Sequence, residues 1–346
     1  MKDLPFVSVI IANLNSRQYL ARCLLSLMDI DYPKQKLEII LVDDASSDDS
    51  VDFIKHKFPS VKIIRNKKTL GPAESRNIGI KITKGNLIAF LDNDVEVEAN
   101  WLKPLVDTII SNGNIAICSP KVLFLHNKKQ INSAGGAVNI YGDGWGRGVF
   151  EEDRYQYDNK KNIFFGCSAA MLTKKEIIER IGCFDKDYFY LYEDLDYAWR
   201  ANLIGFKAVY VPESVVYHKF GVTMKRDSLV VRFFTERNRI LTLLKNYETR
   251  TLIRILPKFL KQRINRVIYN IKGIKKMEFQ GYLSFLAAWL WNALHIYETL
   301  KKRASIQSIR QISDKNIFDL MEDYRYKIFI EKQRIKGKFS KKSKRS

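Results

Sequence analysis

A run of five apolar residues, 87–91, ends in two carboxylates, Asp92 and Asp94. Such a run suits a β-strand that is buried on both faces, because successive side chains of a strand point to opposite sides of the sheet. Sheets covered on both faces are typical of α/β folds with mostly parallel strands, and these folds bind ligands beyond the carboxyl ends of the strands. The residues Asp-Asn-Asp also suit a solvated turn. By itself, this stretch therefore predicts either a turn or a metal site.

The first 125 residues alternate between strand and helix patterns. Strands are expected at 6–12, 36–43, 61–66, 86–92 and 115–123, and helices at 16–29, 46–58, 72–83 and 100–113. This succession predicts an α/β fold in which a mostly parallel sheet carries helices on both faces. No GxGxxG motif follows the first strand, which disfavours a dinucleotide-binding fold. Residues 126–166 are rich in Gly, Asn, Tyr and Asp and indicate a long loop-bearing region, whereas the pattern beyond residue 227 is helical.

The formal net charge of +21 is concentrated in the C-terminal part of the chain. Residues 246–346 contain 24 Lys and Arg against 8 Asp and Glu, and the part before them contains 35 against 30. Residues 252–273 place apolar side chains at helical spacing among basic ones, a pattern typical of helices that bind membrane surfaces. The apolar run 282–297 is too short to span a bilayer comfortably, and its Trp289, Trp291 and Tyr297 suit the headgroup region. Alternatively, both helices pack on the preceding domain or on another subunit.

Three acidic clusters follow apolar or aromatic segments. They are Asp43 with Asp44, Asp92 with Asp94, and Glu193 with Asp194 and Asp196. Strands that end at one sheet edge bring the first two clusters together, and a divalent metal held by one or two carboxylates takes further ligands from phosphates and water. Asp43 and Asp44 suit hydrogen bonds to a nucleobase or ribose, or capping of the helix that follows them. Arg76 is expected to face the base or the phosphates.

Seven stretches, in this order, resemble the sequence pattern of family 2 glycosyltransferases with the GT-A fold. They are VSVIIANLN (7–15), VDDASSD (42–48), LGPAESRNIGI (70–80), KGNLIAFLDNDV (84–95), GCSAAML (166–172), the segment 181–218 around YLYEDLDYAW, and ERNRI (236–240). The resemblance covers about residues 6–238, and its specificity lies in the succession of the motifs. The chain is most similar to the rhamnosyltransferase-like branch, which builds bacterial surface polysaccharides.

The resemblance implies a transferase that uses a nucleotide-sugar donor of the UDP or dTDP type. Asp92-Asn93-Asp94 is similar to the DxD element of the family, with Asp92 near the ribose and Asp94, together with His218, on a Mn²⁺ or Mg²⁺ that bridges the diphosphate. Asp194 falls on the position of the catalytic base, which takes the proton from an acceptor hydroxyl in a single inverting displacement. The resemblance further implies Asp43, Asp44 and Arg76 at the nucleotide, Gly166 and Ser168 at the donor sugar, and Glu193, Trp199 and Arg200 in acceptor or supporting positions.

Some of these roles stay open. Glu193 and Asp196 either raise the pKa of the base by like-charge repulsion or face solvent or cap a helix. Trp199 either forms the bottom of the acceptor pocket or is a helix residue packed in the core. The Asn-Gly that usually follows the first aspartate in the family reads Asp44-Ala45 here, which is expected to alter contacts to the base.

The sequence predicts three parts: a GT-A catalytic domain at 1–226, a helical membrane-associated module at 227–305, and a basic C-terminal segment at 306–346 with a disordered tail. No signal peptide is visible and the four cysteines are scattered, which favours a cytoplasmic protein, peripheral on the inner face of the cell membrane. The acceptor is expected to be a glycan or a lipid-linked precursor, and the oligomeric state is open. No nucleic acid is expected, because no nucleic-acid-binding motif accompanies the charge; a nucleic-acid- or polyanion-binding protein is the alternative class. A phosphatase of the haloacid-dehalogenase type is disfavoured because its aspartate pair belongs on the first strand.

Overall fold

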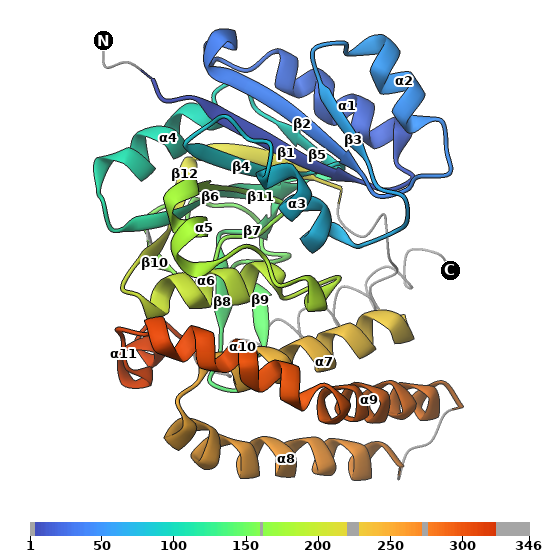
Figure 1. The fold of residues 1–346 in the computed structure, drawn as a ribbon, viewed down its shortest axis with the longest axis vertical. Coiled ribbons are helices and arrows are strands. Elements are labelled where there is room, and N and C mark those ends of the chain that lie inside the picture. The colour runs from blue at the N-terminus through green and yellow to red at the C-terminus, as the bar shows by residue number, and fades with distance from the viewer. Residues whose placement is uncertain (1–3, 160–161, 220–227, 272–275, 323–346) are drawn as a thin grey trace.

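The computed structural model in Figure 1 describes residues 4–159, 162–219, 228–271 and 276–322, without the side chains of 263–271 and 276–282. Its first elements are β1 (Val7–Asn13), α1 (Arg17–Met28), β2 (Leu37–Asp43), α2 (Ser50–Lys57), β3 (Lys62–Arg65), α3 (Pro72–Ile80), β4 (Leu87–Asp92), β5 (Val95–Val97), α4 (Leu102–Ser111) and β6 (Ile115–Phe124). There follow β7 (Asn127–Ser133), β8 (Gly136–Val138), β9 (Gly144–Gly146), β10 (Asn162–Ile163), β11 (Ala170–Lys174), α5 (Lys175–Ile181), α6 (Glu193–Leu203) and β12 (Lys207–His218). The described chain ends with α7 (Leu229–Asn246), α8 (Thr249–Ile271), α9 (Lys276–Leu294), α10 (Ile296–Ile309) and α11 (Asp314–Phe318).

Ten of the described strands form one mixed sheet. Its order is β10-β12-β6-β11-β4-β1-β2-β3, with β5 paired to β12 and β7 paired to β6. Strand β1 runs parallel to β2 and β4, β2 runs parallel to β3, and β6 runs parallel to β12, whereas β11 lies antiparallel between β4 and β6. The predicted α/β fold with a mostly parallel sheet and helices on both faces is therefore confirmed (Figure 1).

The apolar run at 87–91 forms β4, the strand beside β1. Leu87, Ala89 and Leu91 belong to the core that also contains residues of α1, α2 and α4. Ile88 and Phe90 belong to the second core, with residues of α3, α5 and α6. Because the side chains alternate between two covered faces, no position in the run tolerates a polar residue. Full burial of a Leu or Phe side chain contributes about 1.5–3 kcal/mol, so this strand is a firm support for the carboxylates that follow it.

The region 126–166, expected to be a long loop, contains four short strands. Strand β7 extends the sheet beside β6, β10 pairs with β12, and β8 and β9 form a separate two-stranded sheet. The glycines of this region serve packing: a Cβ at Gly136 would lie 2.5 Å from the Phe165 ring. The sequence prediction missed these strands because they are short and rich in Gly and Asn, and therefore lack a clear apolar alternation.

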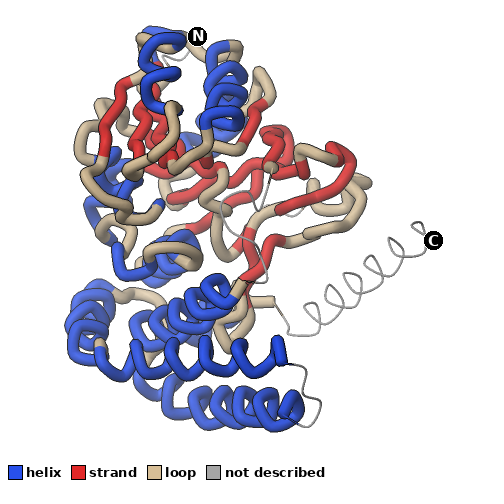
Figure 2. The backbone as a smooth tube through the Cα atoms, turned by 90° about the vertical axis from the view of Figure 1, so that its right-hand side faces the viewer, coloured by secondary structure: helices blue, strands red, loops and turns tan. Residues whose placement is uncertain are grey.

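The C-terminal helices form a layer below the sheet in both views (Figures 1 and 2). Helix α7 packs on α6 and is flanked by α9 and α10. The backbone N–H groups of Gln311 and Ile312, after α10, donate to the carbonyl of Leu203 at the end of α6. These contacts agree with the predicted alternative in which the helices pack on the preceding domain. Among the helices of the described residues, none is long and apolar enough to cross a membrane.

The limits of the predicted parts are not all visible in the structure. The boundary after residue 226 and the tail from residue 323 lie outside the described residues. Residue 305, the predicted end of the helical module, lies inside α10. Trp289, expected at a headgroup region, instead packs against α7, where its Nε1 donates to Glu236 Oε1 at 3.3 Å. Tyr297 is 66% exposed.

Candidate active site

Three neighbouring strands end in polar residues at the same edge of the sheet. Strand β1 ends at Asn13, β2 at Asp43 and β4 at Asp92, and Asn13 lies opposite Asp43 in the parallel register. The Asn13 side chain joins the two acidic clusters: its Nδ2 donates to Asp43 Oδ1 at 3.1 Å, and its Oδ1 accepts from Asn93 Nδ2 at 2.8 Å. The structure thus brings together the clusters that the sequence places after β2 and β4.

Asp43 is fully buried and binds groups of its own chain. Besides Asn13, its carboxylate accepts from the Ser46 hydroxyl and from the Ser46 N–H at 3.1 Å, and Arg65 Nε lies 3.4 Å away. Asp43 does not cap α2, the helix after it. That helix starts at Ser50, whose N–H donates to Asp48 Oδ1 at 3.2 Å. The capping alternative is therefore wrong for Asp43.

Asp44 is 3% exposed and organises a different loop. Its Oδ1 accepts from Asn66 Nδ2 at 2.9 Å and from Leu70 N at 2.8 Å, and its Oδ2 accepts from Gly71 N at 2.9 Å. Asp44 thereby fixes the turn that leads into α3 instead of capping α2. Direct contact of either aspartate with a nucleotide stays a prediction.

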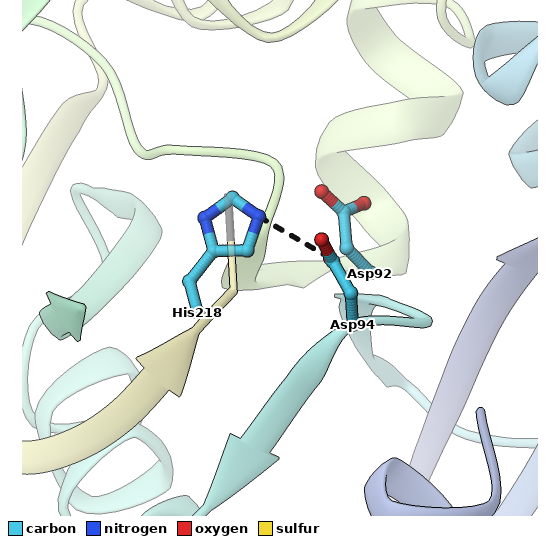
Figure 3. Close-up of side chains that lie close together, drawn as sticks. All are labelled: Asp92, Asp94 and His218. Carbon is cyan, nitrogen blue, oxygen red and sulfur yellow. Dashed lines mark ion pairs between the residues drawn. The ribbon is translucent and has the colours of Figure 1, made fainter. Parts of the chain in front are cut away.

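Asp92, Asp94 and His218 form a cluster whose composition fits a divalent cation (Figure 3). One ligand atom of each residue lies within 4.8 Å of the others. His218 reaches the cluster because β12 pairs with β5, so that His218 stands opposite Val95. Its Nε2 lies 3.2 Å from Asp94 Oδ1, and its Nδ1 lies 3.3 Å from Asn132 Oδ1.

The chemistry of this donor set favours a transition-metal ion. Two carboxylates and an imidazole suit Mn²⁺, and an Asn132 oxygen that accepts from Nδ1–H leaves Nε2 of His218 as the ligand atom. Burial opposes a charge on His218, but the hydrogen bond to Asp94 and the charges of Asp94 and Asp92 raise its pKa above the ordinary value. A positive charge is therefore stabilised where the cation would lie.

Arg76 lies between the DxD strand and the start of α6. It is 2% exposed; its Nη2 donates to Asp92 Oδ1 at 2.6 Å and its Nη1 donates to Glu193 Oε1 at 2.8 Å. We expected this guanidinium to face a base or a diphosphate, and the structure pairs it with two carboxylates instead. Removal of one partner from such a buried pair costs about 3–5 kcal/mol, so Arg76 rigidly connects the two acidic segments.

Asp194 lies in the first turn of α6 and is partly exposed. Its Oδ2 accepts from Ser168 N at 3.0 Å. Burial and the charge of Glu193 raise the pKa of Asp194 to about 7, against the opposing effects of hydrogen bonds and of Arg76. A carboxylate with this pKa is partly ionised at neutral pH and retains enough basicity to accept a proton. The charge of Glu193 contributes to this pKa as predicted.

Asp196 points away from the site. It is fully buried, accepts from Arg200 Nε at 2.9 Å, and lies 3.0 Å from Lys245 Nζ of α7. The expectation that Asp196 faces solvent or caps a helix is therefore wrong. Arg200 also donates to the carbonyls of Gly182 at 3.0 Å and Cys183 at 2.9 Å, so it joins α6 to the end of α5.

Trp199 and Gly166 have packing roles. Trp199 is fully buried, and its ring meets Phe164 and Tyr247 edge-to-face at centroid distances of 5.2 and 4.9 Å. Of the two predicted roles for Trp199, the structure agrees with the packed helix residue. A Cβ at Gly166 would lie 2.8 Å from Ile117 Cγ2, so packing on β6 requires a glycine there. Contact of Gly166 with a donor sugar stays a prediction.

Ser168 connects the groups around the carboxylate of Asp194. Its N–H donates to Asp194, its hydroxyl donates to Glu193 Oε1 at 3.2 Å, and its carbonyl accepts from Arg76 Nη2 at 3.4 Å. Glu193 Oε2 is buried and has no hydrogen-bond partner among the described residues. The two adjacent carboxylates are therefore held by one serine and one arginine.

A strained loop precedes α6; we call residues 188–192 the base loop. Three of its residues have positive φ: Phe189 (56°), Leu191 (69°) and Tyr192 (73°). Bulky residues rarely adopt this conformation, and each costs on the order of 1–3 kcal/mol. Burial and the charges of Asp92 and two further carboxylates raise the pKa of Tyr190 to about 12. The base loop leads directly into α6, whose first turn carries Asp194.

Sequence reasoning missed several polar residues of this site. Asn13 could have been found, because it ends an apolar strand as Asp43 and Asp92 do. Asn132 gave no signal, since it lies on a short strand within the region predicted as loop. The position of Tyr190 depends on the strained base loop, which no sequence pattern specifies.

The fold is that of the GT-A glycosyltransferases. The chain belongs to the family described as Glycosyl transferase family 2, whose model matches residues 8–182. The chain is therefore a glycosyltransferase, as the motifs predicted.

Two curated relatives illustrate the range of this similarity. Glycosyltransferase AglE of Haloferax volcanii is 25% identical over 230 residues, which are 65% of this chain and 71% of AglE. Human polypeptide N-acetylgalactosaminyltransferase 10 is 31% identical over 161 residues, which are 45% of this chain but 25% of that enzyme. The chain thus corresponds to most of the archaeal protein and to a quarter of the human one.

Two solved structures have a similar fold. GalNAc-T7 with UDP, GalNAc and Mn²⁺ superimposes with a TM-score of 0.58 at 21% identity, over 72% of this chain and 49% of that one. Staphylococcus aureus TarS 1-349 in complex with UDP-GlcNAc gives 0.55 at 19% identity, over 82% and 81%. At these identities the likeness establishes the fold.

Proposed function

We propose that this chain is an inverting, metal-dependent glycosyltransferase that moves a hexosyl or deoxyhexosyl group from a nucleotide donor to a hydroxyl of a polysaccharide precursor or lipid-linked acceptor. The observation that carries the proposal is a set of side chains that could hold a cation, Asp92, Asp94 and His218, together with a carboxylate, Asp194, whose pKa is raised to about 7. The transfer needs both groups, because a negative charge develops on the leaving diphosphate while the acceptor hydroxyl loses a proton. The motif resemblance favours the rhamnosyltransferase-like branch and synthesis of a bacterial surface glycan.

Asp94 and His218 would hold Mn²⁺ or Mg²⁺, with Asp92 beside the ion or the ribose. When bound, the metal supplies Lewis-acid stabilisation of the leaving nucleoside diphosphate. The charges of Asp94 and Asp92, which raise the pKa of His218, would also attract a cation to this position, and GalNAc-T7, a protein of similar fold, was solved with UDP and Mn²⁺. Asn132 holds the outer nitrogen of the imidazole and so orients the ligand.

Asp194 would accept the proton of the acceptor hydroxyl while that oxygen bonds to the anomeric carbon and the bond to the diphosphate breaks. Attack from the face opposite the leaving group inverts the anomeric configuration. Ser168 N holds Oδ2 of Asp194, which orients the carboxylate for this transfer. The Glu193 charge keeps the carboxylate basic.

The donor side of the site would be formed by the loops that Asp43 and Asp44 organise, with Gly166 and Ser168 near the sugar. Arg76 would support this side through Asp92 without facing the phosphates. A donor of the UDP or dTDP type follows from the resemblance, and TarS 1-349, whose fold is similar, was solved with UDP-GlcNAc.

A peripheral position on the anionic inner face of the cell membrane is supported by the C-terminal helices. Apolar residues at intervals of three or four are exposed along α9 and α10: Leu283 (51%), Leu286 (65%), Leu290 (60%), Leu294 (72%), Tyr297 (66%) and Leu300 (51%). Within each of the two helices, this spacing places the exposed apolar side chains on one face. Exposed basic residues, Arg254, Lys258 and Lys261, follow helical spacing on the neighbouring α8. An apolar stripe beside basic side chains suits the surface of an anionic bilayer.

The function is tested by calorimetric titration of UDP, dTDP and GDP into the protein, with and without Mn²⁺. We expect one nucleotide to bind only with Mn²⁺, and Asp94→Ala to abolish that binding. Asp107→Ala, an exposed aspartate on α4, is the matched control and is expected to bind normally. If no nucleotide binds under any condition, the proposal is wrong.

Membrane binding is tested by sedimentation with anionic liposomes, neutral liposomes and duplex DNA of the same phosphate concentration. Leu286→Ser and Leu290→Ser are expected to weaken binding to anionic liposomes. Equal binding of wild type and variants to liposomes would contradict the role of the stripe. Tighter binding to DNA would favour the alternative of a polyanion-binding module.

A further inference from the structure

The ERNRI motif of α7 contacts the base loop through two side chains, Arg237 and Asn238, whose role the proposed chemistry leaves open. Asn238 and Arg237 are 0% and 5% exposed and lie below the base loop. Neither is in contact with the cation cluster or with Asp194 by any hydrogen bond of the described residues. Their hydrogen bonds go to main-chain carbonyls of the segment that leads to Asp194.

Asn238 binds the base loop at three places. Its Nδ2 lies 3.0 Å from the carbonyl oxygen of Tyr188, 2.8 Å from that of Tyr190, and 2.7 Å from that of Leu191. An amide nitrogen has two hydrogens, so the three carbonyls must converge on it. Convergence of this kind needs the left-handed conformations of Phe189 and Leu191, which turn successive carbonyls to the same side.

Arg237 orients the Asn238 amide and extends the contact. Its Nε donates to Asn238 Oδ1 at 2.8 Å, which turns the amide nitrogen towards the loop. Its Nη2 donates to the carbonyl of Tyr188 at 2.8 Å and to that of Asp187. The Trp291 ring of α9 lies 4.5 Å from the guanidinium and Asn292 Nδ2 donates to the Arg237 carbonyl at 3.1 Å, so α9 supports the pair from behind.

The opposite side of the base loop packs on the donor side of the site. A Cβ at Gly71 would lie 2.5 Å from the Phe189 carbonyl oxygen, and Gly71 N donates to Asp44. The loop is therefore held between the Asp44 turn and α7. Its last residue, Tyr192, is the N-cap of α6, and Asp194 follows within the first turn. Because the loop leads directly into this turn, we expect a change in the loop to move the carboxylate of Asp194 relative to the cation cluster.

We propose that Asn238, oriented by Arg237, is a positioning residue for the transfer reaction: it holds the base loop in its strained conformation and thereby aims Asp194 at the acceptor hydroxyl. The inference rests on the proposed function. The inference separates nucleotide binding from turnover. The residues of the cation cluster lie on or next to β4, β5 and β12, whereas the orientation of Asp194 depends on α7. Loss of Asn238 should therefore affect turnover much more than nucleotide binding.

The test compares Asn238→Asp with Asn202→Ala. Asn238→Asp keeps the size of the side chain and replaces the donor by an oxygen that repels the three carbonyls. Asn202 is a buried asparagine of α6 that donates to the Phe164 carbonyl at 3.0 Å, away from the base loop. Arg237→Lys, which keeps the charge, is the second variant in case Asn238→Asp fails to fold.

Two measurements are made on each full-length variant. Hydrogen exchange of the backbone amides of 188–192, followed in the ligand-free protein, is expected to become faster in Asn238→Asp than in Asn202→Ala. The titration first identifies which of UDP, dTDP and GDP binds with Mn²⁺. Turnover is then followed as the release of this nucleotide from its nucleotide sugar. A displacement of about 1 Å costs roughly 100-fold in rate, so kcat should fall by about that factor in Asn238→Asp while nucleotide Kd changes by less than about twofold.

The possible outcomes distinguish this inference from the function on which it rests. If the wild type binds no nucleotide with Mn²⁺ and releases none, the proposed function fails and the catalytic part of the inference fails with it. An active wild type together with an inactive Asp194→Asn variant would support the proposed function. If Asn238→Asp and Arg237→Lys then have the same kcat as Asn202→Ala, only the positioning role is wrong. Unchanged exchange of the base loop in Asn238→Asp would also overturn it.

Discussion

Neutralising Glu193 should shift the pH at which the enzyme becomes active. In the proposed mechanism the ionised form of Asp194 accepts the proton, so activity is expected to rise with pH through the pKa of this group, about 7 in the wild type. The charge of Glu193 is one of the two main causes of that value. Glu193→Gln keeps the size of the side chain and an oxygen that accepts from Arg76 and Ser168, but it removes the charge. The pKa of Asp194 should therefore fall.

The size of the effect follows from Ser168, which binds both carboxylates. Its hydroxyl lies 3.2 Å from Glu193 Oε1 and its nitrogen 3.0 Å from Asp194 Oδ2, so one residue bridges the two charges and they lie on the order of 6–9 Å apart, with about 6 Å giving the strongest repulsion. With an effective dielectric constant of about 20, their repulsion is about 3 kcal/mol, or about two pH units as an upper bound. Arg76, released from one partner, acts in the same direction. In the pH profile of activity, we expect the midpoint of the rise on the acidic side (the acidic limb) to move from about pH 7 to about pH 5–6.

The assay is the pH dependence of kcat/KM between pH 5 and 9, with the melting temperature measured at each pH. At pH 6 about a tenth of Asp194 is ionised in the wild type, so the variant should lose less of its maximal rate there. Its plateau above pH 8 should be lower, because a weaker base accepts the proton less readily. Glu179→Gln, at an exposed position of α5, removes one charge away from the site and should leave the limb near pH 7. A folded Glu193→Gln enzyme whose limb also stays near pH 7 would refute the reasoning.

Three further predictions test other parts of the structure. Asn132→Ala removes the oxygen at His218 Nδ1 and should weaken Mn²⁺ binding about 10–100-fold in a metal titration with nucleotide present; unchanged affinity would contradict the role of Asn132. Burial raises the pKa of Asp185, but Lys245 and Lys302 outweigh this effect and hold the pKa well below its usual range. The ionised carboxylate therefore stabilises the folded protein above about pH 4, and this contribution is lost as the pH falls. Asp185→Asn should therefore lower the free energy of unfolding by about 3–5 kcal/mol at pH 7, as measured by urea denaturation, and the deficit should shrink in acid; a deficit independent of pH would contradict this. Ala45 has φ 64°, a left-handed conformation that costs a non-glycine residue about 1–2 kcal/mol. Ala45→Gly relieves this strain but loses about 0.4–1 kcal/mol, because glycine gives the unfolded chain more freedom. The variant should therefore have a higher melting temperature, and a lower one would show that Ala45 is not strained.

The predicted strands and helices of the first 125 residues were found in the structure because their signals are local. The run at 87–91 predicts a strand covered on both faces, since an apolar residue at every position satisfies two cores at once. The carboxylates after β2 and β4 then meet by the geometry of parallel strands. The short strands between 127 and 163 were missed because their stability comes from pairing with β6 and β12 and from glycine packing, which leave no periodic pattern.

The amino-acid sequence by itself determined the parallel strands β1 to β4, the family and the set of acidic residues, because these depend on side-chain periodicity and on ordered motifs. Only the tertiary structure decided what each charged group faces. It paired Arg76 with Asp92 and Glu193, turned Asp196 towards Lys245, and set His218 beside Asp94. Ion pairing and burial act across distances in space that have no counterpart in sequence spacing, and the same carboxylate becomes a base, a ligand or a structural partner according to the groups that the fold brings to it.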